Sequence, residues 1–191
     1  MQNLSAESGR ITIRPVLASD REDLHRWLNN PEVLRYYEGR DKPQSYADID
    51  ARYLSVKDGS MARCVILVDH QPAGYLQAYQ HPLRAPPGMG LSQGPRVYGV
   101  DLFIGEPDLW NQGVGTQAIK LVTQTLVRVY GADAVIVDPR VNNPRAVRAY
   151  KKCGYRIARR LKAHEQHEGA FVDCWLMVYQ TAKPGVPFHS E

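Results

Sequence analysis

The segment from residue 97 to residue 131 constrains the fold of this chain more than any other. It begins with a strand-like run, VYGVDLFIGEP, continues through the loop DLWNQGVGT and ends in a helical pattern that stops at Gly131. Where a loop enters a helix, the first backbone N–H groups have no acceptor within the helix, and the helix dipole is positive there. Glycine at such a point lets the backbone approach a ligand closely. The segment therefore predicts a strand–loop–helix unit with an anion site, suited to a pyrophosphate, at Gly113, Val114, Gly115 and Thr116.

The composition is that of a single globular domain. Of the 191 residues, 43% are hydrophobic and 23% are charged, and we expect one domain over residues 1–180 with a flexible tail at 181–191. No apolar run approaches the roughly 20 residues that span a membrane, and the first residues contain no hydrophobic signal core. The three cysteines are odd in number and form no CxxC pair, which predicts thiols in a reducing compartment. We expect a cytoplasmic protein without a membrane partner.

The net charge of +4 does not by itself identify a partner. Mild basicity suits nucleic acid or a polyanionic small molecule equally well. The charges are interspersed, however, and no basic run is interleaved with aromatic residues. We therefore expect no nucleic-acid partner.

Periodicity and turn residues predict the other elements. We expect strands near residues 11–16 and at 64–68, 73–79, 97–104, 134–137, 155–161 and 171–178. We expect helices after a capping box at Ser19 and Glu22, near 46–56, from Thr116, and after an Asn143 cap. HEQHEG is predicted to be a loop, as is the Pro- and Gly-rich stretch at 81–96, which we expect to be mobile and beside a site. This order predicts a mixed sheet flanked by helices, an α+β (mixed α/β) fold.

The glycine loop has three interpretations. Residues 113–118 match G-x-G-x-x-A, and Asp138 ends the following strand, as in a dinucleotide-binding fingerprint. Against this, EPDLWNQ separates strand from glycines, the motif lies past mid-chain, and the upstream strands look antiparallel. A Walker loop is excluded because no GK[ST] follows, and an ordinary glycine turn remains the simplest alternative. Asp101, a carboxylate inside the apolar strand, favours a transfer enzyme with a nucleotide cofactor.

The loop and its surroundings resemble the GCN5-related N-acetyltransferase (GNAT) superfamily. There the loop reads (Gln/Arg)-x-x-Gly-x-(Gly/Ala), whereas here Trp110 replaces the leading residue. NNPRAVRAYKKCGY resembles the next motif of that family. The blocks YYEGRDKP, GYLQAYQ, YGVDLFIGEPDLW, VDPRVNNPRAVRAYKKCGY and HEQHEGAFVDCWLM are similar to aminoglycoside 6'-N-acetyltransferases and span nearly the whole chain. The resemblance implies a GNAT fold, with a mostly antiparallel sheet of six or seven strands and about four helices.

The resemblance also implies a bacterial protein with acetyl-CoA as co-substrate and with no metal. It implies that the strand backbone at Phe103 and Ile104 pairs with the pantetheine arm. The residues that it places at the cofactor are Phe103, Ile104, Trp110, Gln112, Gly113, Val114, Gly115, Thr116, Asn143 and Lys152.

Acetyl transfer to an amine needs a carboxylate that binds the ammonium and takes its proton, and an acid for the leaving thiolate. The resemblance implies Asp101 as the first and Tyr150 as the second. An aminoglycoside acceptor of the kanamycin or tobramycin type would carry several ammonium groups, so further carboxylates are expected around it. The candidates are Glu38, Asp101, Asp138 and Glu168, with Glu165 and Asp173 as further possibilities.

Several alternatives remain open from the sequence. The acceptor is an aminoglycoside or another amine, such as a polyamine, a protein N-terminus or a siderophore precursor. A non-catalytic coenzyme A-binding domain is the alternative of a different class, and Asp101 and Tyr150 argue against it. His164 and His167 have the H-x-x-H spacing of metal ligands, but no third ligand is apparent. The protein is expected to be a monomer or a homodimer.

Overall fold

The structure, a computed structural model, describes residues 1, 3–55, 59–81 and 96–181. All but the first residue of the predicted tail at 181–191, and all but the two end residues of the predicted loop at 81–96, lie outside the described residues. Five α-helices lie in the described part: α1 (Arg21–Trp27), α2 (Pro31–Leu34), α3 (Tyr46–Ile49), α4 (Val114–Arg128) and α5 (Pro144–Lys152).

The described strands form one sheet of eight, in the order β1-β2-β3-β4-β5-β6-β8-β7. All pairs are antiparallel except β5 with β6. The predicted α+β GNAT-like architecture is confirmed, with one strand more than predicted because Ala6–Ser8 adds an edge strand. The strands are β1 (Ala6–Ser8), β2 (Ile11–Pro15), β3 (Met61–Val68), β4 (Gln71–His81), β5 (Val97–Ile104), β6 (Ala134–Val137), β7 (Arg156–His167) and β8 (Ala170–Gln180).

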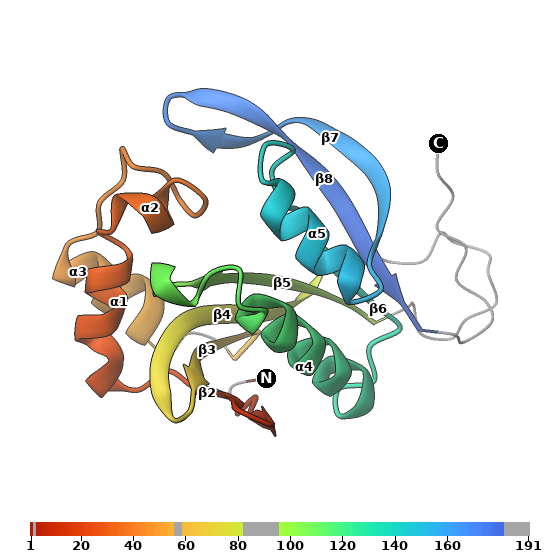
Figure 1. Cartoon of the computed structure of the whole chain (residues 1–191), viewed down its shortest axis with the longest axis horizontal. Helices are drawn as coiled ribbons and strands as arrows, with labels where there is room; N and C mark the ends of the chain where they lie inside the picture. Colours follow the sequence, from red (N-terminus) through yellow and green to blue (C-terminus); the bar gives the residue numbers. More distant parts are fainter. Residues whose placement is uncertain (2, 56–58, 82–95, 182–191) are drawn as a thin grey trace.

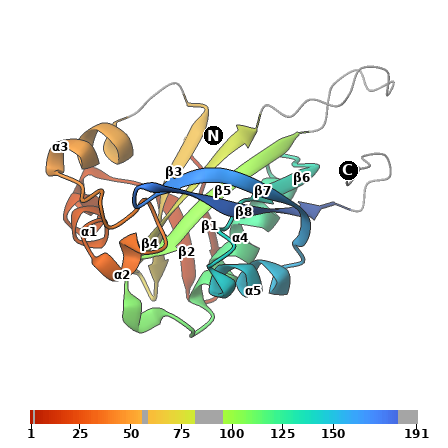
Figure 2. The same ribbon diagram turned by 90° about the horizontal axis from the view of Figure 1, so that it is seen from above.

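Two apolar clusters pack on opposite faces of this sheet. Alternate residues of β3 belong to different clusters, because successive side chains of a strand point to opposite faces. Cys64 and Ile66 pack with α4, whereas Val65 and Leu67 pack with Trp27 of α1. In both views α1–α3 gather at one end of the molecule, with α4 and α5 at the other (Figures 1 and 2).

Two local predictions were wrong. The Ser19–Glu22 capping box does not form, because Asp20 takes that place: its buried carboxylate accepts the Leu17 N–H at 2.7 Å and pairs with Arg14. HEQHEG is not a loop, because β7 continues to His167 and only Glu168 and Gly169 turn the chain. Both of these residues have positive φ, as a two-residue hairpin turn of type I′ requires.

The feature that positions the site is a gap between β5 and β6. These strands pair only from Val97 to Gly99 of β5, and β6 ends at Val137, before Pro139. Beyond that point the chain follows β8 instead, since Arg140 bridges to Cys174 and the Trp175 N–H donates to the Pro139 carbonyl. The second half of β5 therefore has no strand partner on this side, and its edge is open.

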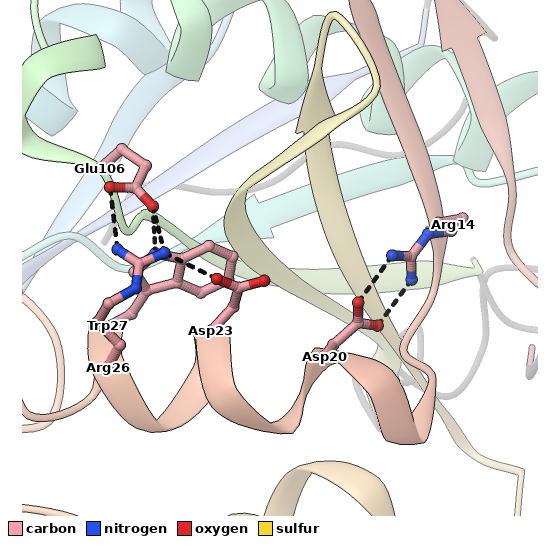
Figure 3. Close-up of polar contacts among 6 residues, drawn as sticks. All are labelled: Arg14, Asp20, Asp23, Arg26, Trp27 and Glu106. Atoms are coloured by element: carbon pink, nitrogen blue, oxygen red, sulfur yellow. Dashed lines mark hydrogen bonds and ion pairs between the residues drawn. The ribbon is translucent and has the colours of Figure 1, made fainter.

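The turn that follows β5 is fixed to α1. Glu106 accepts hydrogen bonds from the Trp27 indole N–H at 2.9 Å and from both terminal nitrogens of Arg26, which also pairs with Asp23 (Figure 3). The Arg26 guanidinium holds the pKa of the Glu106 carboxyl below its usual range. A Cβ on Gly105 would overlap the Trp27 ring, so the indole lies directly on the backbone of this turn.

Gly105→Ala should lower the free energy of unfolding by about 1–3 kcal/mol and the Tm by several degrees, because the new methyl must displace the Trp27 ring. Thermal unfolding of the purified variant measures this. Gly115→Ala is the matched control, since its Cβ would meet only Ile104 Cγ1 at 3.8 Å, an ordinary contact. Equal Tm values for Gly105→Ala and wild type would contradict the packing described.

Candidate active site

Two adjoining cavities occupy the gap and the sheet face beside it. The first, called the helix-terminus cavity, has a volume of about 250 Å³ and lies at the start of α4. The second, called the acidic cavity, has a volume of about 430 Å³ and lies over β5 and β7. The residues that line both, and so mark their junction, are Tyr36, Leu102, Asn143, Ala146 and Tyr150.

The helix-terminus cavity has the features of an anion site. Gly113 is the N-cap of α4, with φ +81°, so no capping side chain covers the first N–H groups of the helix. The N-terminal end of a helix of this length also carries a positive partial charge. Three cations of α5 line the same cavity: Arg145, Arg148 and Lys152. Together these groups favour a ligand with several negative charges.

The open edge of β5 forms another wall of this cavity. Leu102, Phe103 and Ile104 line it, along the part of the strand that β6 leaves unpaired. The Ile104 carbonyl accepts a hydrogen bond from the Trp110 indole at 2.8 Å, which fixes the loop against the strand end. An extended ligand with amide groups could pair with an edge of this kind.

Asp101 faces the acidic cavity. It lies opposite Gln77 of β4, whose side-chain amide donates a hydrogen bond to the carboxylate at 2.7 Å. Burial raises the pKa of Asp101 to about 6, and the negative charges of Asp138, Glu165 and Glu38 add to this shift. Among the described residues no cation forms an ion pair with Asp101, so its charge is available to a ligand.

The other carboxylates of the cavity have protein partners. Asp138 contacts the His164 Nε2 at 3.0 Å, and Glu38 pairs with Arg52 at 2.7 Å. Glu165 lies 3.6 Å from the buried Arg140. Four carboxylates therefore surround one space in which Asp101 has the weakest compensation, and a ligand with more than one positive charge is favoured there.

Tyr150 lies where the two cavities meet. Its ring is buried against Tyr155, with the ring centroids 5.4 Å apart. Burial raises the pKa of this phenol well above its usual range, so the hydroxyl keeps its proton at neutral pH. Within the described part of the chain this hydroxyl has no hydrogen-bond partner, so it can donate to a ligand at the junction.

A clasp joins two segments that line the acidic cavity, the loop after α2 and the end of β7. The tip of the β7–β8 hairpin reaches across to the loop after α2, as both ribbon views show (Figures 1 and 2). Glu168 accepts hydrogen bonds from the Arg40 backbone N–H and guanidinium, at distances from 2.6 to 3.1 Å. The ring of His167 contacts the Glu38 carbonyl at 3.3 Å. Arg40 holds the pKa of the Glu168 carboxyl at about 2, so the clasp stays charged at neutral pH.

Comparison with known proteins identifies the family. A family model described as an acetyltransferase (GNAT) domain matches residues 16–163. The chain belongs to the GNAT acetyltransferases. Aminoglycoside N(6')-acetyltransferases type 1 of Klebsiella pneumoniae and Serratia marcescens are each 24% identical to it over 154 residues, which cover 76% of this chain and 73% of those proteins.

Solved structures with this fold include two of different specificity. AAC(6')-Ib in complex with ribostamycin and coenzyme A superposes with a TM-score of 0.72, at 20% identity, covering 90% of this chain and 94% of that chain. Spermidine N-acetyltransferase from Vibrio cholerae, in complex with coenzyme A and spermine, gives a TM-score of 0.73 at 18% identity, covering 91% and 96%. At these identities the structures show a common fold.

Most residues predicted for the site of this GNAT protein lie in the two cavities. The helix-terminus cavity includes nine of the ten predicted cofactor residues: Phe103, Ile104, Trp110, Gly113, Val114, Gly115, Thr116, Asn143 and Lys152. The exception is Gln112, whose amide donates to the Asp108 carbonyl at 2.6 Å. The acidic cavity includes Glu38, Asp101, Asp138 and Tyr150, together with Glu165, but Glu168 lies in the clasp instead. Asp173 pairs with Arg160.

Two residues that sequence reasoning missed belong to the site. Gln77 faces Asp101 because β4 and β5 pair in that register, a relation that the sequence shows only once the two strands are paired. Arg145 lines the helix-terminus cavity, and its position directly after the predicted N-terminal proline of the helix was the available signal.

Neither a membrane span nor a metal centre is found in the described residues. None of their helices is long and apolar enough to cross a membrane. Among them, no three His, Cys, Asp or Glu side chains lie together as metal ligands would. The H-x-x-H histidines, His164 and His167, contact different acidic partners.

Asp101→Asn should become more stable relative to wild type as the pH rises from 4 to 7. The folded state raises the pKa of Asp101 from 3.8 to about 6, so it binds this proton more tightly than the unfolded chain does. Wild type therefore loses stability between these two values, by roughly 2–3 kcal/mol, and the Asn variant does not. Denaturant unfolding at several pH values measures the difference. Asp108→Asn, at an exposed position, is the control, and a pH-independent difference for Asp101→Asn would contradict the assignment.

Proposed function

We propose that this protein transfers the acetyl group of acetyl-CoA to the 6'-amine of aminoglycoside antibiotics and so inactivates them. The observation that carries the proposal is Asp101: a carboxylate without a cationic partner among the described residues, in an acidic cavity that adjoins an anion site. The curated relatives support the choice of acceptor and position. Resistance to the drugs and a cytoplasmic location are parts of the same prediction.

The helix-terminus cavity fits coenzyme A. The uncapped start of α4 and the three α5 cations suit its phosphates, and the open edge of β5 suits the amides of its pantetheine arm. Bound acetyl-CoA supplies a thioester, so that a C–N bond forms to the acceptor, the C–S bond breaks, and the amine proton and the thiolate must each be accommodated. Gln112 makes a local contact in the loop and is not needed for this fit.

Asp101 is proposed to bind the acceptor ammonium and take its proton. With a pKa of about 6, the carboxyl is mostly ionised at pH 7 and still basic enough to share a proton with an amine. Gln77 orients the carboxylate through a neutral hydrogen bond, which leaves its negative charge for the ligand. A positioned base of this kind contributes roughly 10²–10⁴-fold to a rate.

Tyr150 is proposed as the acid for the coenzyme A sulfur. Its phenol lies at the junction of the two cavities and keeps its proton because burial raises its pKa. An O–H donor at this point stabilises the charge that develops on sulfur as the thioester breaks. Asn143, which caps α5 through its bond to the Ala146 N–H at 3.1 Å, holds the start of the helix that carries this tyrosine.

The shape of the acidic cavity favours a small acceptor over a polypeptide. The clasp between Arg40 and Glu168 joins two walls of the cavity, whereas an extended peptide needs an open groove. Hydrogen-bond donors such as Lys42, Arg140 and Gln166 also line the cavity. They suit the hydroxyl and ether oxygens of an aminosugar, which a polyamine lacks.

Purified protein with acetyl-CoA should release free thiol when kanamycin is added, and not when an analogue without the 6'-amine is added. Thiol release measures the reaction, and mass spectrometry of the product locates the acetyl group. Spermidine and a basic peptide form the other arms. If only spermidine is acetylated, the acceptor is a polyamine and not an aminoglycoside. If no amine is acetylated although coenzyme A binds, the result favours a non-catalytic domain.

The acid limb of kcat/KM should have a midpoint near pH 6, because protonated Asp101 can neither bind the ammonium nor accept its proton. Gln77→Met should move this limb to higher pH, since the hydrogen bond from Gln77 lowers the pKa of Asp101. Asp101→Asn should reduce kcat/KM by about 10²–10⁴-fold and abolish the limb, with coenzyme A binding retained. An unchanged limb in both variants would assign the base to another group.

A further inference from the structure

Arg145 has surroundings unlike those of the arginines that hold the fold together. Its guanidinium lies over two aromatic rings of the helix-terminus cavity, 4.0 Å from the Trp110 centroid and 4.8 Å from the Tyr36 centroid. These two rings meet edge to face, 6.4 Å apart. The arrangement places the cation between Tyr36, which follows α2, Trp110 of the glycine loop, and the start of α5.

Several other arginines pair with carboxylates. Arg14, Arg26 and Arg40 each reach a carboxylate oxygen within 2.7 Å. Among the described residues Arg145 has no such partner, although it is only half-buried and lines a cavity. An aromatic face stabilises a guanidinium without using its N–H donors, so these donors can still bind a ligand.

Burial lowers the pKa of Arg145, because the loss of water disfavours the charged guanidinium. A bound anion would favour the charged form and so raise this pKa again. Arg148 and Lys152 follow on the same helix at spacings of three and four residues and line the same cavity. Residues so spaced lie on one face of a helix. Arg145 is therefore the innermost, pre-oriented member of a cationic row beside the start of α4.

We propose that Arg145 binds a phosphate group of the donor, with Trp110 and Tyr36 holding its guanidinium in place through cation–π contacts that leave its N–H donors for the phosphate. The assignment rests on the proposed function, because it takes the donor to be acetyl-CoA. It gives Trp110 a definite part in donor binding: the indole N–H donates to the Ile104 carbonyl, and the face of the ring contacts the Arg145 guanidinium. The pyrophosphate and the 3'-phosphate are the two groups of coenzyme A with this chemistry.

Calorimetric titration with coenzyme A, in the absence of any acceptor, tests the assignment. Arg145→Gln should raise the Kd at least tenfold, and Arg145→Lys should raise it less, because a lysine keeps the charge and loses the fork. Arg156→Gln, at an exposed position on β7, should leave the Kd unchanged. Thermal unfolding confirms that each variant is folded.

Titration with 3'-dephospho-coenzyme A identifies the phosphate. An equal loss with both ligands places Arg145 at the pyrophosphate, and a loss confined to coenzyme A places it at the 3'-phosphate. Trp110→Leu should weaken binding in wild type and have little further effect in Arg145→Gln, because the ring acts through the cation.

The two proposals fail in different ways. A folded Arg145→Gln variant that binds both ligands as tightly as wild type would overturn the role of Arg145 alone. Wild-type protein that does not bind coenzyme A would overturn the donor assignment, and the role of Arg145 with it.

Discussion

The separation of β5 from β6 is the constraint on which the rest of the site depends. A parallel pair that continued to Ile104 would close the sheet and leave no edge for a ligand. The short β6, ending before Pro139, and the pairing of the following residues with β8 force the two strands apart. The gap then places the start of α4, the open half of β5 and Tyr150 around one space.

The charge that lines each cavity differs from the net charge of the chain, because the fold gathers carboxylates in one cavity and α5 cations in the other. The chain carries a net charge of +4, yet four carboxylates line the acidic cavity. The α5 cations lie instead on the helix-terminus cavity, on the other side of Tyr150. One protein can therefore attract a polyanion and a polycation to adjacent places, provided that the junction stays narrow enough to keep their charges apart.

The sequence predicted what depends on local patterns. The Gly113 loop, the capping of α5 by Asn143 and the apolar strand around Asp101 each follow from neighbouring residues. Contacts between distant segments were not predictable in this way. Glu168 looked like a substrate carboxylate because its loop is acidic, but the hairpin turn brings it to Arg40, 128 residues away. Ser19 lost its predicted cap role because Arg14 fixes Asp20 instead.

Charged side chains in this molecule have two kinds of partner, and the kind of partner decides whether the charge is left for a ligand. Where a carboxylate meets a guanidinium, as in Glu168 with Arg40 or Glu106 with Arg26, both charges are already satisfied and the pair fixes one segment to another. Asp101 has a neutral amide as its partner, and Arg145 has two aromatic rings. Such partners orient a charged group without neutralising it, so the remaining attraction is left for a ligand. By this criterion the charges of Asp101 and Arg145 are left for ligands, and Tyr150 lies between the two cavities that these residues line.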